Sequence, residues 1–288
     1  MMAEYLAALA AVLVAPFIGG VLMGVDRIVS ARLQSRQGPP LFQPFYDILK
    51  LFAKRRMAAN TFQMISVSVY LASMVLSLAL LVMGQDLLVL LFILALGNIM
   101  LILGGFSVKS PYSQLGSQRE VLVLLAYEPL LVCMVVGAYI MTGSFSAASV
   151  FGLDRPLALS MPAFVVTQAL VMAMKLHKSP FDVSASHHAH QELVRGLYTE
   201  FSGPQMAVIE LAHLYELVLL LGFIALFWHT NLAVGIALAL ACHGAVIILD
   251  NISARMTTRW MFGFTWSFGL ALAAANLAAL YATGPLPR

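Results

Sequence analysis

Charged residues are scarce in this chain. They make up 10% of its 288 residues, whereas roughly a quarter of the residues in a soluble domain are charged. Hydrophobic residues make up 61%, and the mean hydropathy is +0.91. This composition excludes a soluble globule and predicts an all-α integral membrane protein built almost wholly from membrane spans.

Cysteine is almost absent. Cys133 and Cys242 are the only two, and each lies inside an apolar run, as a small buried residue would. No CxxC or other iron–sulfur spacing exists, so we expect no redox centre in this chain. Electron carriers would then belong to a partner or to a bound organic cofactor. Basic residues are also missing before the first apolar stretch, which predicts a retained first span rather than a cleaved signal peptide.

Long apolar runs, by contrast, are abundant, and each is long enough to cross a bilayer. We predict one polytopic domain over residues 1–288 with eight spans, at about 5–25, 63–83, 87–106, 120–142, 159–176, 205–227, 231–249 and 261–282. All but two of the 16 Lys and Arg residues fall on one side of these spans, the exceptions being Arg155 and Arg288. The positive-inside rule places the basic side in the cytoplasm and both termini outside the cytoplasmic (inner) membrane.

One segment, at about 41–55, is neither a loop nor a span. Its apolar residues follow helical spacing, while its polar residues mostly fall elsewhere: Leu41, Phe45, Ile48, Leu49 and Phe52 against Gln43, Asp47, Lys50 and Lys54. This pattern predicts an amphipathic helix on the cytoplasmic surface. Because nearly all polar segments face the cytoplasm, we expect a docking surface for a soluble assembly. The partners we expect are proteins and lipid, with no nucleic acid.

Ionisable residues inside spans are costly and therefore indicate function. Five of them are expected within roughly 8–16 Å of the cytoplasmic surface, from a helix rise of about 1.5 Å per residue. They are Glu128, Glu210, His213, Glu216 and His243. Pro129 frees a backbone carbonyl beside Glu128, so we expect a hydrated pocket that carries protons or ions. Two alternatives remain: protonated glutamates that only pack, and haem ligation by His213 and His243.

A polar segment at about 177–204 contains "SPFDVSASHHAHQELVRGLYTEFSG" between two apolar runs. His187, His188 and His190 could bind a metal with Glu192 or Asp182, or the segment could be a solvated loop. Its interleaved aromatic and apolar residues favour a third interpretation, a cytoplasmic docking loop against a soluble partner. Histidines there could also exchange protons near neutral pH.

Three motifs resemble one known family. "DRIVSARLQSRQGPPLFQPFYDILKLF", "REVLVLLAYEP" and the polar segment just quoted follow, in order, the cytoplasmic segments and the fourth span of the complex I subunit 1 family, a family of NADH dehydrogenase membrane subunits. The resemblance covers residues from about 26 to 216. It implies that the chain anchors a peripheral redox module and links its chemistry to ion movement, with Asp182, Glu192 and Glu200 carried over from the family's loop.

Two departures narrow the resemblance. Histidines stand before Gln191 where the quinone-linked enzymes have acidic residues, and His213 stands where their sixth span has a glutamate. In these respects the chain is more similar to membrane-bound energy-converting [NiFe] hydrogenases of the Ech and CO-induced type. That similarity implies the following partners: hydrogenase large and small subunits, a ferredoxin-like iron–sulfur subunit and an antiporter-like membrane subunit. The [NiFe] and iron–sulfur clusters would lie in those partners.

The expected function is therefore a non-catalytic anchoring and energy-coupling subunit of a ferredoxin-linked [NiFe] hydrogenase that moves protons or sodium. The alternatives are the quinone-site subunit of a NADH:quinone oxidoreductase-like complex and an independent ion carrier. We assign no catalytic residue and no metal. The expected interface with the redox module comprises Arg36, Asp47, Lys50, Asp182, His187, His188, His190, Gln191, Glu192, Arg195 and Glu200.

Overall fold

The structure is a computed structural model that describes residues 2–55, 57, 60–185 and 195–283. Its described part is helical and contains no β-strand, which confirms the all-α prediction. The helices are α1 (Met2–Leu33), α2 (Gln43–Phe52), α3 (Thr61–Val82), α4 (Leu87–Phe106), α5 (Pro111–Thr142), α6 (Ala147–Phe151), α7 (Leu157–Ser160), α8 (Pro162–Lys175), η1 (Gly196–Tyr198), α9 (Gly203–Leu226), α10 (Leu232–Ile252), α11 (Thr258–Phe264), η2 (Thr265–Gly269) and α12 (Leu270–Thr283).

Seven helical segments of the described chain are long and apolar enough to cross a membrane. They correspond to α1, α3, α4, α5, α9, α10 and the continuous α11–η2–α12 rod. The eighth predicted span, 159–176, is interrupted at Met161, whose backbone (φ −128°, ψ 52°) is not helical. Pro162 explains the break, because a proline disfavours helical geometry in the residue before it. The count of eight spans is therefore approximate.

Two spans are longer than their apolar runs predict. α1 continues beyond residue 25 to Leu33, and α5 begins at Pro111 instead of near 120. In α1 the added turns carry Asp26 and Arg27, whose charges are paired with Lys178 and Asp47 respectively. A hydropathy pattern ends a span at its first charges, whereas the helix continues because those charges find partners.

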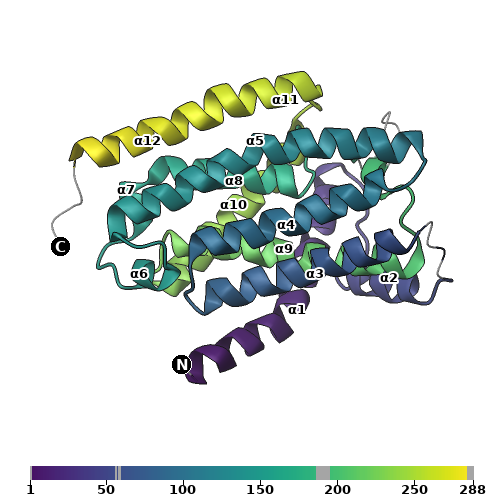
Figure 1. The fold of residues 1–288 in the computed structure, drawn as a ribbon, viewed down its shortest axis with the longest axis horizontal. Helices are drawn as coiled ribbons and strands as arrows, with labels where there is room; N and C mark the ends of the chain where they lie inside the picture. Colours follow the sequence, from purple (N-terminus) through teal and green to yellow (C-terminus); the bar gives the residue numbers. More distant parts are fainter. Residues whose placement is uncertain (1, 56, 58–59, 186–194, 284–288) are drawn as a thin grey trace.

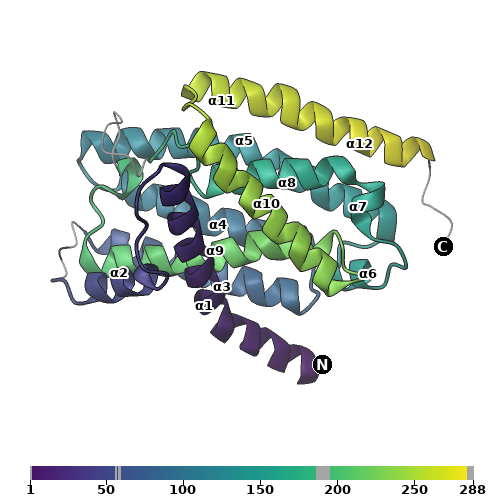
Figure 2. The ribbon, with the colours of Figure 1, turned by 180° about the vertical axis from the view of Figure 1, so that it is seen from behind.

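The helices form a bundle whose two ends differ (Figure 1). α2 and η1 lie at one end, and α6 and α7 lie at the other, toward which both ends of the described chain also point (Figure 2). α9 occupies the centre, packing against α1, α2, α3, α8 and α10. The α11–η2–α12 rod packs against α5 and α8 on the outside of the bundle.

The predicted amphipathic segment contains helix α2, which packs against α1 and α9. Glycines on α1 allow this close approach. A Cβ on Gly20 would overlap the Phe45 ring, and a Cβ on Gly24 would overlap the carbonyl oxygen of Leu41. The close packing of α1 against α2 thus fixes the position of the segment that connects these two helices.

We expect Gly20→Val to destabilise the protein by about 1–3 kcal/mol, because the larger side chain must displace Phe45. Thermal unfolding in detergent measures the effect. Gly244→Val in α10 is the matched control, since a Cβ there would have nothing within 4 Å. Equal melting temperatures for the two variants would show that the α1–α2 seam is not tightly packed.

Candidate functional site

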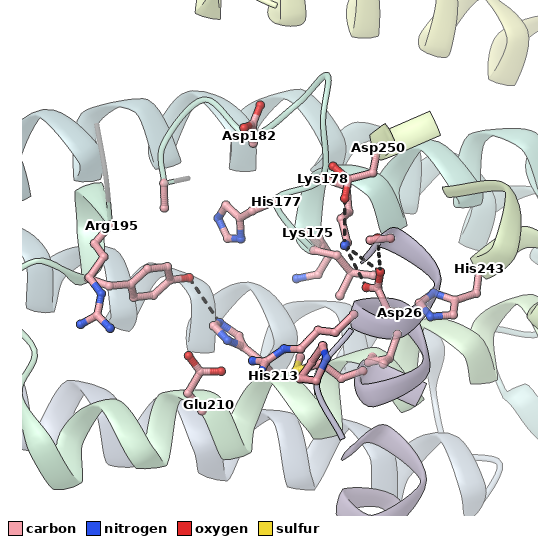
Figure 3. Close-up of a pocket in the computed structure, with 18 of the residues that line it drawn as sticks. Asp26, Lys175, His177, Lys178, Asp182, Arg195, Glu210, His213, His243 and Asp250 are labelled. Carbon is pink, nitrogen blue, oxygen red and sulfur yellow. Dashed lines mark hydrogen bonds and ion pairs between the residues drawn. The ribbon is translucent and has the colours of Figure 1, made fainter. Parts of the chain in front are cut away.

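A cavity of about 430 Å³ lies toward the α2 end of the bundle, lined by residues of α1, α8, η1, α9, α10 and the segments that follow α1 and α8 (Figure 3). Six residues predicted from the sequence line it: Glu210, His213 and His243 from the expected ion path, and Arg36, Asp182 and Arg195 from the expected interface. The structure thus brings part of both predicted groups to one chamber. Asp26, Lys175, His177, Lys178, Tyr198 and Asp250 also line it.

One wall of the cavity joins η1 to α9. Tyr198 Oη lies 3.3 Å from His213 Nε2, within hydrogen-bonding distance, and Glu210 is one helical turn from His213. Burial, together with the charges of Glu120, Glu216 and Glu210, raises the pKa of Tyr198 well above its ordinary value. Tyr198 therefore keeps its hydroxyl proton at neutral pH and can hydrogen-bond to the imidazole.

A second wall is an ion cluster that ties α1 to α10. Lys178 Nζ lies 2.8 Å from Asp26 Oδ2 and 3.0 Å from Asp250 Oδ2, and Asp250 Oδ1 accepts a 2.8 Å hydrogen bond from the Ser179 backbone amide. Burial lowers the pKa of Lys178, but the two carboxylates raise it more, so the pKa lies above its ordinary value. The ammonium is therefore a permanent cross-link between two helices and the segment after α8.

His177 forms a third contact, with α5. Its Nε2 lies 3.1 Å from Glu120 Oε2, and Ser184 Oγ donates a hydrogen bond to the same carboxylate. Burial lowers the pKa of His177, but the Glu120 charge and hydrogen bond raise it more, leaving it above the ordinary 6.5. Glu216 adds to the rise and Lys175 opposes it. The His177–Glu120 pair fastens the segment after α8 to the N-terminal third of α5.

The raised pKa of His177 makes this fastening pH-dependent. Its stabilisation is complete below the unfolded-state pKa of about 6.5 and is lost as the pH rises through the higher folded-state value. We therefore expect Glu120→Gln to lower the melting temperature most below about pH 6.5 and progressively less above it. Thermal unfolding of the wild-type and Glu120→Gln proteins at pH values below and above about 6.5 measures the difference in melting temperature. A difference that increases toward alkaline pH would contradict the pairing of His177 with Glu120.

Glu216 lies deeper, in an ion pair that the sequence did not reveal. Lys175 Nζ is 2.5 Å from Glu216 Oε1, and the two side chains are only 2% and 4% exposed. Tyr70 Oη donates a 3.0 Å hydrogen bond to Glu216 Oε2. Lys175 also lies 3.5 Å from Tyr127 Oη and 5.0 Å from the centre of its ring. The expected span-six cluster is thus divided: Glu210 and His213 line the cavity, and Glu216 pairs behind it.

Glu128 does not line the cavity. It lies in a separate hollow of about 40 Å³ between α4 and α5, together with Asn98 and Tyr127. His243 lines the large cavity from α10; it is buried, and neither ring nitrogen has a hydrogen-bond partner within the described structure. The five predicted path residues therefore occupy two hollows and one buried pair rather than one shared pocket.

The predicted interface residues are placed differently from one another. Asp47 pairs with Arg27 at 2.7 Å, Arg36 hydrogen-bonds to Gln34, and Lys50 is exposed on α2. Asp182 is buried, and Arg255 Nε lies 3.9 Å from its Oδ1. Because it is buried, Asp182 would affect a partner's contact only by holding the segment after α8 in place. Arg195 is exposed and Glu200 half-buried. The interface role of all six remains a prediction.

The remaining predicted residues, His187, His188, His190, Gln191 and Glu192, lie outside the described residues. Within the described ranges, no three His, Cys, Asp or Glu side chains are grouped as a metal site would require. That finding does not extend to a site built with the three loop histidines.

The sequence prediction missed Lys175, His177, Lys178, Asp26 and Asp250. From the sequence, the two lysines contribute only to the charge asymmetry that predicts orientation. The available signal was their position: Lys175 directly follows a long apolar run that contains no other charge. A lysine directly after such a run can lie either inside the membrane span or at its end.

A family profile described as "NADH dehydrogenase" matches residues 6–281. Two relatives from Escherichia coli are each 28% identical: hydrogenase-4 component C (84% of this chain, 81% of the relative) and formate hydrogenlyase subunit 4 (89% and 93%). A NADH-quinone oxidoreductase subunit of Thermomicrobium roseum is also 28% identical, over 67% of each chain.

The fold is similar to that of a chain in the solved structure of the membrane-bound sulfane sulfur reductase, an archaeal respiratory membrane complex. The TM-score is 0.83 at 24% identity, and the match covers 96% of this chain and 99% of the other. The relatives thus come from both hydrogenase-type and NADH-quinone oxidoreductase-type complexes. On the profile match over nearly its whole length, this multi-pass membrane protein belongs to the NADH dehydrogenase family.

Proposed function

We propose that this chain is the membrane-anchoring and energy-coupling subunit of a ferredoxin-linked [NiFe] hydrogenase. It would link redox chemistry in a cytoplasmic module to proton or sodium movement. The observation that carries the proposal is the 430 Å³ cavity at the α2 end, whose wall combines titratable groups from α1, α9, α10 and the segment after α8. Such a chamber lets a partner at that end change proton affinities inside the membrane arm.

Changes in proton affinity at the cavity can supply enough free energy to move an ion. Binding or reducing a group beside the cavity changes the potential at Glu210 and His213, and a shift of one pKa unit corresponds to about 1.4 kcal/mol. Moving one charge through 100 mV requires about 2.3 kcal/mol, so a shift of about two pKa units is sufficient. The chain's own residues hold and release protons, while electrons remain in the partner.

Topology and partners form the finer part of the proposal. The α2 end would face the cytoplasm, where most Lys and Arg residues gather, and both termini would lie outside. Hydrogenase large and small subunits and a ferredoxin-like subunit would cover the cavity, carrying the [NiFe] and iron–sulfur clusters. An antiporter-like subunit would continue the ion path within the membrane.

A quinone-linked function is the second candidate. It is supported by the likeness to the NADH-quinone oxidoreductase subunit of Thermomicrobium roseum and by the apolar part of the cavity wall, which includes Met23, Met206 and Leu217. A quinone headgroup would then occupy the large cavity, which in the hydrogenase proposal contains water.

Hydrogen production by native membranes distinguishes the hydrogenase function from the quinone-linked function. Membranes supplied with reduced ferredoxin should evolve hydrogen and build an ion gradient, and quinone-site inhibitors should have no effect. Deleting this chain should abolish the gradient and release the hydrogenase activity into the soluble fraction. NADH-driven quinone reduction that such inhibitors block would replace the first candidate with the second.

A further inference from the structure

The α11–η2–α12 rod contains a π-helical turn, η2, where it packs against α5 (Figure 1). At its end the Leu270 amide donates to the Thr265 carbonyl, five residues back instead of the four of an α-helix. Gly269, the last residue of the turn, is buried, and a Cβ there would lie 3.2 Å from Leu130 Cδ1 on α5. Single π turns inside α-helices are rare and occur frequently at functional sites. The contact between η2 and α5 is therefore a place to look for a function.

α5 lacks one backbone hydrogen bond at this contact. Pro129 has no N–H, so it cannot donate to the carbonyl oxygen of Leu125, four residues earlier in the helix. Trp266 Nε1, on η2, lies 3.4 Å from that oxygen and donates a hydrogen bond to it. A side chain 141 residues further along the chain thus supplies the donor that the proline removes.

The surroundings make this hydrogen bond important. Leu125 lies near the middle of α5 (Pro111–Thr142), and the Leu125 and Trp266 side chains are 47% and 46% exposed on the outside of the bundle. Hydrocarbon surrounds a spanning helix at that depth, and an unpaired carbonyl is costly there because no water can bind it. The indole is also held in place, since it stacks on Phe262 with ring centres 5.1 Å apart.

The turn of α5 that receives this hydrogen bond carries Glu128. Glu128 directly precedes Pro129 and lines the hollow between α4 and α5. Resting on the proposed function, in which Glu128 belongs to the ion path, we propose that Trp266 is a positioning residue for Glu128. Its indole N–H pairs with the Leu125 carbonyl and so holds this turn of α5 in the one conformation that places the carboxyl group at the hollow.

Four variants separate the hydrogen bond from simple packing. Trp266→Phe keeps an aromatic ring for stacking on Phe262 but has no donor. Trp266→His keeps an N–H at the corresponding ring position in a smaller side chain. Pro129→Ala returns a backbone N–H to α5, so that Leu125 no longer needs the indole. Trp260→Phe, on α11 and 73% exposed, is the control for the tryptophan-to-phenylalanine change.

Thermal unfolding of the full chain in detergent tests the hydrogen bond itself. We expect Trp266→Phe to lower the melting temperature by about 3–8 °C, because it leaves the Leu125 carbonyl unpaired. Trp266→His and Trp260→Phe should each lower it by less than half as much. In the Pro129→Ala protein, adding Trp266→Phe should have little effect. An equal loss with and without Pro129 would show that the indole acts by packing alone and would overturn the proposal.

Failure of Trp266→Phe to fold would still give a decision. The double variant Pro129→Ala/Trp266→Phe has its backbone donor restored, so we expect it to fold. A double variant that also fails to fold would overturn the proposal, because the loss would then not depend on the missing donor.

Ion movement tests the positioning of Glu128. In membrane vesicles driven by reduced ferredoxin, the ratio of the ion gradient to the hydrogen formed is measured. Hydrogen evolution should continue in every variant. We expect the ratio to fall at least threefold in Trp266→Phe and to stay near the wild-type value in Trp266→His and Trp260→Phe.

The outcomes distinguish the positioning role from the proposed function. A wild-type ratio in Trp266→Phe would overturn the positioning role and leave the proposed function standing. Wild-type vesicles that evolve no hydrogen from reduced ferredoxin would overturn the proposed function and, with it, the positioning role. The unfolding experiment depends on neither and reports only whether the indole replaces the donor that Pro129 lacks.

Discussion

Lys178→Met is expected to lower the melting temperature by about 6–12 °C. Lys178 is the one cation shown between Asp26 and Asp250 in the described structure, and the three side chains are 17%, 11% and 15% exposed. Removing it leaves two largely buried carboxylates without their counter-charge, which costs about 3 kcal/mol. For a protein of this size each kcal/mol corresponds to about 2–4 °C. Thermal unfolding in detergent measures the shift.

The triple variant Asp26→Asn/Lys178→Met/Asp250→Asn tests the cause of that loss. It removes all three charges, so we expect it to recover most of the lost stability. Lys50→Met on the exposed face of α2 controls for the loss of one lysine and should change the melting temperature little. If the triple variant is no more stable than Lys178→Met, the lysine acts through packing of its aliphatic chain and not through charge.

Glu128→Gln is expected to reduce ion movement at least tenfold while hydrogen evolution by the detergent-solubilised complex continues. Among the described residues that line the small hollow, the titratable side chains are Glu128 and Tyr127. Glutamine keeps the shape and hydrogen-bonding capacity of the side chain but cannot bind a proton. The measurement is the ion gradient formed by membrane vesicles during ferredoxin-driven hydrogen production.

Val132→Gln provides the matched control for Glu128→Gln. Val132 lines the same hollow on the same helix and is 41% exposed, so the change adds an amide without removing a proton acceptor. We expect this variant to keep its gradient. Equal gradients in the wild-type and Glu128→Gln proteins would remove Glu128 from the path, and equal losses in both variants would show that the hollow tolerates no change.

Local patterns in the sequence predicted the helices well because their causes are local. The apolar spacing of Phe45, Ile48 and Phe52 is sufficient to predict α2, and seven apolar runs became membrane-length helices. The break before α8 also has a local cause, Pro162, which the count of apolar residues ignored. The hydropathy pattern ends α1 too early and starts α5 too late, because it stops at charged residues that the helices include.

The candidate site was only partly predictable, because its pairs join residues far apart in the chain. Glu216 could be recognised as an intramembrane acid, but its partner Lys175 lies on another helix. In the sequence, Asp26 directly follows the first predicted span, and only the fold brings Lys178 and Asp250 beside it. The grouping of Glu210, His213 and His243 at one cavity was predictable from depth, whereas the separation of Glu128 depended on which way its helix faces.

The measurement that most directly tests the central claim is mass spectrometry of the proteins that co-purify with this chain from its native membrane in mild detergent. The coupling-subunit account predicts a [NiFe] large subunit, a small iron–sulfur subunit and a ferredoxin-like protein in stoichiometric amounts. NADH- or quinone-module subunits in their place, or a chain that purifies alone and moves ions by itself, would contradict it.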